Sequence, residues 1–253
     1  MTLEAQHVPA LDPNKLLMIT ARTGGLMPGG ITIERQGEFA DIRRALACAH
    51  AGDTVSLSGW ADNPRVFSPV DLTLTIRVID PLVIRATGNS LANLRTNDRR
   101  DATESIDVVA GAQQIRRRAP ELISAALHGV ALRQPLLRLV GAGPGTTPTG
   151  DDVIVGVLAA FDITGRARAA RRLRTAVAPL LPRTTSVSRH YLAAAIDGRF
   201  GEHVHDLVAA LEKSASTKST IERALRWGAT SGIDLLTGIT TGLLNTVQAE
   251  SAA

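Results

Sequence analysis

The chain has 253 residues, 44% of them hydrophobic and 21% charged, which is typical of a globular protein with one large domain or two small ones. Its single cysteine, Cys48, excludes an intrachain disulfide and a zinc site built from cysteines. The formal net charge is +4, but arginines are spread along the chain among acids, and no basic stripe is interleaved with aromatic residues, so nucleic-acid binding is not indicated.

The first hundred residues are predicted to form a β-rich domain, a small barrel or sandwich. Short segments rich in Val, Ile, Thr and Leu are separated by Gly, Pro, Asn and Asp, among them KLLMITA, GGITIE, DTVSLSG and VDLTLTIRVID. From Val70 to Val78 apolar residues alternate with mostly polar ones, the pattern of a strand with one buried face. One helix is expected among these strands, from about Phe39 to His50.

The rest of the chain, residues 101–253, is predicted to be an all-helical domain, so the predicted fold class is α+β. The segment DVVAGAQQIRRRAPELISAALHG ends at Gly129, a suitable helix C-cap, and Pro135 can open a short helix through Val140. An apolar helix is expected at 153–163. Four further helices are expected at about 185–196, 202–213, 217–227 and 233–248.

A glycine-rich loop, GAGPGTTPTGDD, precedes the apolar helix and is typical of an anion site. The first turn of a helix has free backbone N–H groups, and the helix dipole adds partial positive charge there. The candidate substrate-binding residues of this loop offer close backbone approach or hydroxyl groups: Gly143, Gly145, Thr146, Thr147, Thr149 and Gly150. The sequence has neither the Lys-Ser/Thr pair of a Walker A loop nor the glycine spacing of a dinucleotide fold.

Two adjacent acids follow the loop, and two interpretations of them stay open. Asp151 and Asp152 could hold Mg²⁺ beside a phosphate, or polarise a substrate, which makes Mg²⁺ the one candidate cofactor. Alternatively, Thr149 or Asp151 simply caps the helix, where a carboxylate is stabilised by the dipole.

A second motif repeats the pattern of the first. TGDDVIVG, from Thr149 to Gly156, matches SGIDLLTG, from Ser231 to Gly238, so that Asp152 aligns with Asp234. A glycine inside a helix costs about 1 kcal/mol relative to alanine, and close packing of two helices would offset that cost. We therefore predict that the two helices cross at these glycines and that both N-terminal turns face one site. Its candidate residues are Asp151, Asp152 and Asp234 as catalytic groups, with Ser231 and Gly232 as substrate-binding groups.

A hydroxyl cluster lies between the two motifs, in LPRTTSVSRHYLAAAIDG. One hydroxyl there is expected to cap a helix, and the Arg183 guanidinium matches a carboxylate or phosphate, although a solvated surface arginine is the alternative. The candidate substrate-binding residues are Arg183, Thr184, Thr185 and Ser186. The histidines of HVH, His203 and His205, could bind a metal, but the favoured interpretation is that they lie on an exposed helix face.

Three segments, GAGPGTTPTGDDVIVG, RTTSVSRHYLAAAIDGRFGEHVHDLVAAL and GATSGIDLLTGITTGLL, together resemble the family that includes the H subunit of the oxamate carbamoyltransferase complex. The resemblance covers roughly 141–244 and, more faintly, the N-terminal part. It implies an N-terminal β domain, a helical C-terminal domain, and a part in carbamoyl transfer between oxamate and phosphate alongside other subunits.

The leading functional prediction is an enzyme subunit acting on a small anion such as carbamoyl phosphate, oxamate or phosphate. The alternative is a non-catalytic binding or assembly subunit whose aspartates only cap helices, which the absence of an obvious Ser-His or Cys-His nucleophile favours slightly. The expected partners are other enzyme subunits or further copies of this chain, with no nucleic acid and no membrane. The single cysteine and an N-terminus unlike a secretory signal predict a cytoplasmic location.

Overall fold

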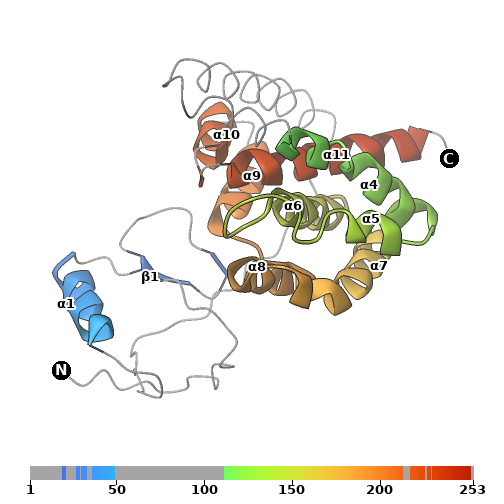
Figure 1. Cartoon of the computed structure of the whole chain (residues 1–253). Coiled ribbons are helices and arrows are strands. Elements are labelled where there is room, and N and C mark those ends of the chain that lie inside the picture. Colours follow the sequence, from blue (N-terminus) through green and yellow to red (C-terminus); the bar gives the residue numbers. More distant parts are fainter. Residues whose placement is uncertain are drawn as a thin grey trace, which may run out of the picture.

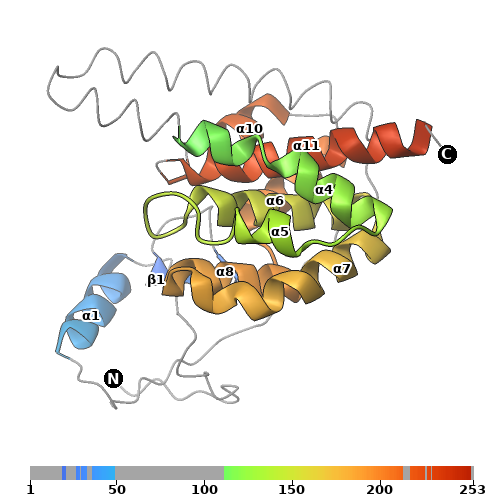
Figure 2. The ribbon, with the colours of Figure 1, turned by 45° about the vertical axis from the view of Figure 1, so that its right-hand side comes forward.

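The structure is a computed structural model, and it describes residues 19–20, 27–28, 30–32, 36–48, 111–212, 217–225, 227–228 and 230–251. The described part from residue 111 onward is a helical body (Figures 1 and 2). Residues 111–116 are helical, and the elements that follow are α4 (Ala119–His128), α5 (Arg133–Leu137), α6 (Thr149–Ile163), α7 (Ala167–Val177), the 3-10 helix η1 (Ala178–Arg183), α8 (Ser186–Ile196), α9 (Glu202–Glu212), α10 (Thr217–Leu225) and α11 (Ser231–Ser251).

The predicted fold class is wrong in its N-terminal part. The described residues there form the helix α1 (Gln36–Ala47) and two strands of two residues each, β1 (Ile19–Thr20) and β2 (Ile31–Thr32), paired in parallel. A barrel needs a closed ladder of paired strands, which these two cannot supply. Alternation marks a half-buried strand but does not name its partner, so the pattern alone could not establish a barrel or sandwich. The alternating run at 70–78 lies outside the described residues, and the division at residue 100 stays a prediction.

Helix α6 is the centre of the helical body. It packs against α11, α4, α7 and α8, and Figures 1 and 2 show it running alongside α11. Its apolar side chains from Val153 to Phe161 are almost all buried, because nearly every face of the helix meets a neighbour. Since aromatic residues are scarce, Leu, Ile, Val and Ala fill most of this core. The prediction of a buried helix after the glycine loop is confirmed.

The glycines of the two repeated motifs make the crossing of α6 and α11. A Cβ placed on Gly156 would lie 2.2 Å from the carbonyl oxygen of Leu235, and one on Gly238 would lie 2.2 Å from that of Val153. Either Cβ would also lie 3.0 Å from the Cα atom of the opposite glycine. Only residues without a side chain allow the two backbones to approach this closely. The predicted crossing is therefore confirmed, and it fixes the start of α6 against the start of α11.

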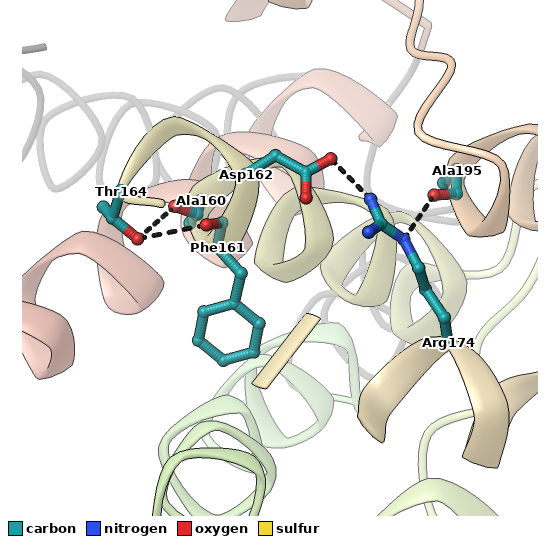
Figure 3. Close-up of polar contacts among 6 residues, drawn as sticks. All are labelled: Ala160, Phe161, Asp162, Thr164, Arg174 and Ala195. Carbon is teal, nitrogen blue, oxygen red and sulfur yellow. Dashed lines mark hydrogen bonds and ion pairs between the residues drawn. The ribbon is translucent and has the colours of Figure 1, made fainter. Parts of the chain in front are cut away.

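Helix α7 is an element that the sequence analysis missed. Its apolar residues Ala169, Ala170, Leu173 and Val177 are buried, while two of its four arginines, Arg168 and Arg171, are exposed. The sequence analysis treated the arginines only as spread along the chain among acids, although the apolar spacing in this segment is that of an amphipathic helix. The helix is tied to its neighbours by Arg174, as Figure 3 shows.

Arg174 joins three helices at the far end of α6. Its guanidinium lies 2.5 Å from the carboxylate of Asp162 on α6 and also donates to the carbonyl of Ala195 on α8 at 3.5 Å (Figure 3). Thr164 closes the end of α6 by donating its hydroxyl to the carbonyl of Ala160 at 2.8 Å. Polar contacts thus fix the C-terminal end of α6, whereas its N-terminal end is preceded by the glycine-rich loop.

Helix ends elsewhere follow the predicted signals closely. Gly129 ends α4 in the left-handed conformation, with φ of 82°, as the C-cap prediction requires. The helical segment before it is interrupted at Arg117 and Arg118, and Pro120 occupies the first turn of α4. Among the described residues, none of the helices has both the length and the hydropathy of a membrane span.

Candidate functional site

The glycine-rich loop enters α6 through a backbone path that its glycines permit. Gly141, Gly143 and Gly145 all have positive φ, at 73°, 114° and 89°. Gly150 lies against the preceding segment, where a Cβ would come within 2.0 Å of the Leu139 carbonyl oxygen. Glycine is required at these positions because an L side chain would be strained or would clash. The loop curves out beyond the first turn of α6 (Figure 2).

The backbone amides of the loop are available to a ligand. The N–H groups of Gly143, Gly145, Thr146 and Thr147 donate no hydrogen bond to any residue within the described part of the chain. Gly145 and Thr146 are exposed to solvent, whereas Thr149 and Gly150 are buried at the helix start. Free amides beside the positive end of a 15-residue helix are the donors that an anion would use.

Asp151 holds the loop in place. It is 0% exposed, and its Oδ1 accepts a hydrogen bond from the Gly141 amide at 2.9 Å. Its Oδ2 accepts hydrogen bonds from the hydroxyls of Thr184 and of Ser188, the latter at 2.7 Å. Burial raises the pKa of this carboxyl, while the hydrogen bonds from Thr184, Gly141 and Ser188 oppose that rise. Asp151 therefore connects the loop, the end of η1 and α8, and neither of its oxygens is left free.

This arrangement does not fit a Mg²⁺ ion held jointly by Asp151 and Asp152. A divalent ion needs carboxylate oxygens that are free to coordinate, and those of Asp151 already accept three hydrogen bonds. Within the described ranges, no group of three or more His, Cys, Asp or Glu side chains is positioned for a metal. We therefore derive no step through a metal.

Asp152 has the opposite environment from its neighbour. It is 3% exposed, and its Oδ2 has no hydrogen-bond partner among the described residues. Burial raises the pKa of the Asp152 carboxyl well above its usual range, and the nearby charges of Asp234 and Asp151 raise it further. The hydroxyls of Ser231 and Thr147 lie beside it and favour the charged form. A buried carboxyl with an unpaired oxygen is costly to stability, which marks Asp152 as a functional candidate.

Asp234 is the partner acid from the second motif. It is 0% exposed, its Oδ1 lies 2.6 Å from Nε of Arg116, and its Oδ2 is unpaired. Burial raises the pKa of Asp234, against the charge and hydrogen bond of Arg116 and the hydroxyls of Thr149 and Thr230. The side chain of Arg116 is itself 9% exposed, so the ion pair is buried.

The structure brings the two motifs together at one place. Asp152 and Asp234 are close enough for the charge of Asp234 to raise the pKa of Asp152. The hydroxyls of Thr147 and Ser231, one from each motif, share a hydrogen bond of 2.8 Å. Gly232 lies against the end of α10, where a Cβ would come within 1.9 Å of the Ala224 carbonyl oxygen, so its role is close packing. The predicted meeting of the two motifs is confirmed.

The hydroxyl cluster before α8 divides into separate roles. Thr185 is the N-cap of α8 and accepts a hydrogen bond from the Ser188 amide at 3.1 Å. Its hydroxyl also donates to the carbonyl oxygen of Thr146 in the loop. Ser186 and Arg183 are exposed, and Thr184 is bonded to Asp151. The predicted cap is confirmed, and the hydroxyls serve mainly to position the loop.

Two residues near the acids were not found from the sequence. Arg116 pairs with Asp234 across 118 positions, and Tyr191 on α8 lies near enough to Asp152 for that charge to raise the pKa of the phenol, after burial. The run of three arginines at 116–118 was visible, but nothing in it marked the one that turns inward. Tyr191 is the only tyrosine of the chain.

The interpretation of His203 as part of an exposed helix face is wrong. The side chain is 7% exposed and stacks on Trp227, with ring centroids 4.3 Å apart. Burial, together with the nearby His205, lowers the pKa of His203 to about 4. The Trp227 carbonyl accepts a hydrogen bond from the Gly232 amide, so this stack supports the turn that begins α11. Burial of an imidazole against an indole is not visible in a two-histidine pattern.

We expect His203 to make the protein less stable at mildly acidic pH. The imidazole has an ordinary pKa of 6.5 when unfolded and about 4 when folded, so the unfolded state binds the proton first as the pH falls. Stability contributed by His203 is present above 6.5 and is lost below it, by about 1.4 kcal/mol between pH 7.5 and pH 5.5. Urea unfolding at both pH values should show this loss, and His203→Phe, which keeps the stack, should reduce it. An equal loss in the variant would contradict this assignment.

A comparison with known protein families finds a match in the region that contains the candidate site. Residues 139–243 match the model of the family described as oxamate carbamoyltransferase subunit AllH. The match spans the glycine-rich loop, both acidic motifs and all helices between them, and it confirms the resemblance found from the sequence. No solved structure matches the chain.

Proposed function

We propose that the chain is a subunit of a carbamoyltransferase-type enzyme whose substrate is a small anion that carries an amide group, such as oxamate or carbamoyl phosphate. The match to the AllH family supports a subunit of this kind of complex. The observation that carries the proposal is the neighbourhood of two unlike sets of groups. Free loop amides lie at the start of α6, and Asp152 and Asp234, each with an unpaired carboxyl oxygen, belong to motifs whose Thr147 and Ser231 hydroxyls share a hydrogen bond.

The loop supplies the anion half of the site. The amides from Gly143 to Thr147 and the positive end of α6 stabilise a carboxylate or phosphate group. Arg183 is exposed at the end of η1, one residue before the Asp151-bonded Thr184, and adds positive charge on this side. The hydroxyls of Thr146 and Ser186 are exposed at the same edge and complete the polar surface toward solvent.

The two acids supply the amide half. A carbamoyl group has an NH₂ with two donors, and the unpaired Oδ2 atoms of Asp152 and Asp234 are two acceptors. Binding the NH₂ group would satisfy both buried oxygens at once and recover part of the cost of burying them. The charge and hydrogen bond of Arg116 oppose the rise that burial causes in the pKa of Asp234, while the raised pKa of Asp152 suits a group that takes up or releases a proton.

A second candidate function is a non-catalytic subunit that binds the anion or holds the complex together. The burial of all three aspartates favours it, because Asp151, Asp152 and Asp234 are at most 3% exposed. In that case the partner subunits supply the chemistry, and the loop presents the substrate to them.

We expect the chain alone to bind phosphate, oxamate and carbamoyl phosphate. Each ligand should raise the melting temperature with the logarithm of its concentration, because it binds only the folded state. Pyruvate, which has oxamate's size and carries a methyl group in place of the NH₂ group, should bind more weakly than oxamate if the two acids receive the NH₂ group.

Transfer of the carbamoyl group between oxamate and phosphate, measured with and without the other subunits of the complex, separates the two candidate functions. Activity of the chain alone, or activity lost in the complex when Asp152→Asn is introduced, supports the enzyme. Full activity of the complex with Asp152→Asn supports the non-catalytic subunit. If none of the ligands changes the melting curve and the complex works without this chain, the proposal is wrong.

A further inference from the structure

A groove away from the acidic residues lies between the loop joining α4 to α5 and the segment formed by α7 and η1. Its volume is about 910 Å³, and its walls come from residues 129–133 on one side and from 171–180 on the other. Both walls lie at the same end of the helical body (Figures 1 and 2). None of its lining residues belongs to the candidate site.

The lining of this groove is largely apolar and includes one exposed large side chain. Val130 is 59% exposed, and it is the exposed large hydrophobic residue of the described part of the chain. Ala131, Ala176, Pro179 and Leu180 extend the apolar surface on both walls. An apolar side chain held open to water, in a hollow rather than singly on a flat surface, is typical of a contact with another molecule.

The groove is held in a fixed shape by its own backbone contacts. Gly129 turns the chain in the left-handed conformation, and the Val130 amide donates to the Ala125 carbonyl at 3.0 Å. The guanidinium of Arg172 on α7 donates to the Val130 carbonyl at 2.7 Å and so joins the two walls. A partner would therefore bind without first ordering this surface, which favours affinity.

The rim of the groove carries positive charge only. Arg133, Arg171 and Arg172 line it, and no Asp or Glu does. Arg133 and Arg171 are exposed and form no ion pair with any residue that the structure describes. By contrast, Arg138 and Arg174 nearby are each paired with an acid. The groove thus has a largely apolar lining and two guanidinium groups that pair with no acid among the described residues.

We propose that this groove docks an acidic segment of a partner protein, one that inserts an apolar side chain beside Val130 and places carboxylates against Arg133 and Arg171. Carboxylates are the groups that the guanidinium fork pairs with, and a hollow of this volume accepts an inserted side chain, whereas a membrane surface is flat. The inference is independent of the proposed function, because the docking groove shares no residue with the anion site.

The test is a selection of random 12-residue peptides, displayed on phage, against the full chain. The expected result is a consensus with a Leu, Ile or Phe flanked by Asp or Glu. A synthetic peptide of that consensus should bind with an affinity that falls as salt rises. Its binding should weaken at least about tenfold with Arg133→Glu/Arg171→Glu. The matched control, Arg43→Glu/Arg117→Glu, changes exposed arginines outside the groove by the same net charge and should leave binding unchanged.

Four results would overturn the proposal. One is the absence of any enriched consensus, and another is a consensus without acids. A third is peptide binding that survives Arg133→Glu/Arg171→Glu. The fourth is evidence for a different occupant. Retention by phosphatidylserine vesicles without peptide binding would assign the arginines to a lipid surface. Self-association that is lost in Arg133→Glu/Arg171→Glu would assign the groove to a second copy of this chain.

Discussion

Asp152→Asn should weaken binding of oxamate and carbamoyl phosphate by about 10- to 100-fold, the range expected when a buried hydrogen bond to a charged group is lost. It should do so without lowering the melting temperature. The reason is that burial penalises the Asp152 carboxylate and its Oδ2 has no partner among the described residues, so the neutral amide removes an unfavourable group. Isothermal titration calorimetry and thermal unfolding of the same preparation check both parts.

Asp151→Asn is the matched control, since it changes the adjacent residue in the same way. Asp151 accepts hydrogen bonds from the Gly141 amide and from the hydroxyls of Thr184 and Ser188. Asparagine has one oxygen and one nitrogen in place of the two carboxylate oxygens, and the nitrogen cannot accept a hydrogen bond. Stability should therefore fall by about 1–3 kcal/mol, while affinity, measured below the melting temperature, stays within a few fold. If Asp152→Asn instead loses stability and keeps full affinity, Asp152 is only a helix-terminal acid.

The pH dependence of stability gives a second measurement on the same variants. Because the pKa of Asp152 is raised in the fold, the native state keeps its proton at pH values where the unfolded chain has released it. The contribution of this group to stability is therefore largest below the unfolded value of about 3.8 and declines as pH rises toward the folded pKa. The stability difference between Asp152→Asn and the original chain should grow over that range.

Most helices from α4 onward were predictable from the sequence because each carries a local signal, whereas α7 was missed. The apolar run after the glycine loop, the glycine at the end of α4 and the hydroxyl before α8 mark their boundaries within a few residues. Alternation in the first hundred residues carries no such information about pairing. The strands β1 and β2 pair over two positions only, which no local pattern in the sequence could have specified.

The candidate site was only partly predictable, for a similar reason. The repeated motif located Asp152 and Asp234. The two copies share a pattern of aspartate and glycine, so their helices were expected to pack through the glycines, as they do. The different roles of Asp151 and Asp152 depend on which way two adjacent side chains turn, and this is decided by Thr184, Ser188 and Gly141. Arg116 reaches Asp234 from a distant helix, a contact made by tertiary packing alone.

The crossing of α6 and α11 makes the second large prediction, because Gly156→Ala should both destabilise the protein and weaken the site. The new methyl group would lie 2.2 Å from the Leu235 carbonyl oxygen, and this backbone atom can move away only if helix α11 shifts as a whole. Overpacking of this kind costs about 3 kcal/mol, from which the helix preference of alanine recovers about 1 kcal/mol. The net loss of about 2 kcal/mol corresponds to a fall of roughly 4–8 °C in melting temperature.

The control for this prediction is Gly111→Ala. Gly111 is also helical, but a Cβ there meets no atom within 4 Å, so the substitution should leave stability unchanged or raise it by up to about 1 kcal/mol. Gly238→Ala should resemble Gly156→Ala, and the double variant should cost less than the two losses added, because one displacement of α11 relieves both clashes. That displacement also separates Asp234 from Asp152, so oxamate affinity should fall in each crossing variant at temperatures where it remains folded. Full additivity with unchanged affinity would show that the crossing stabilises the helical body without positioning the two acids.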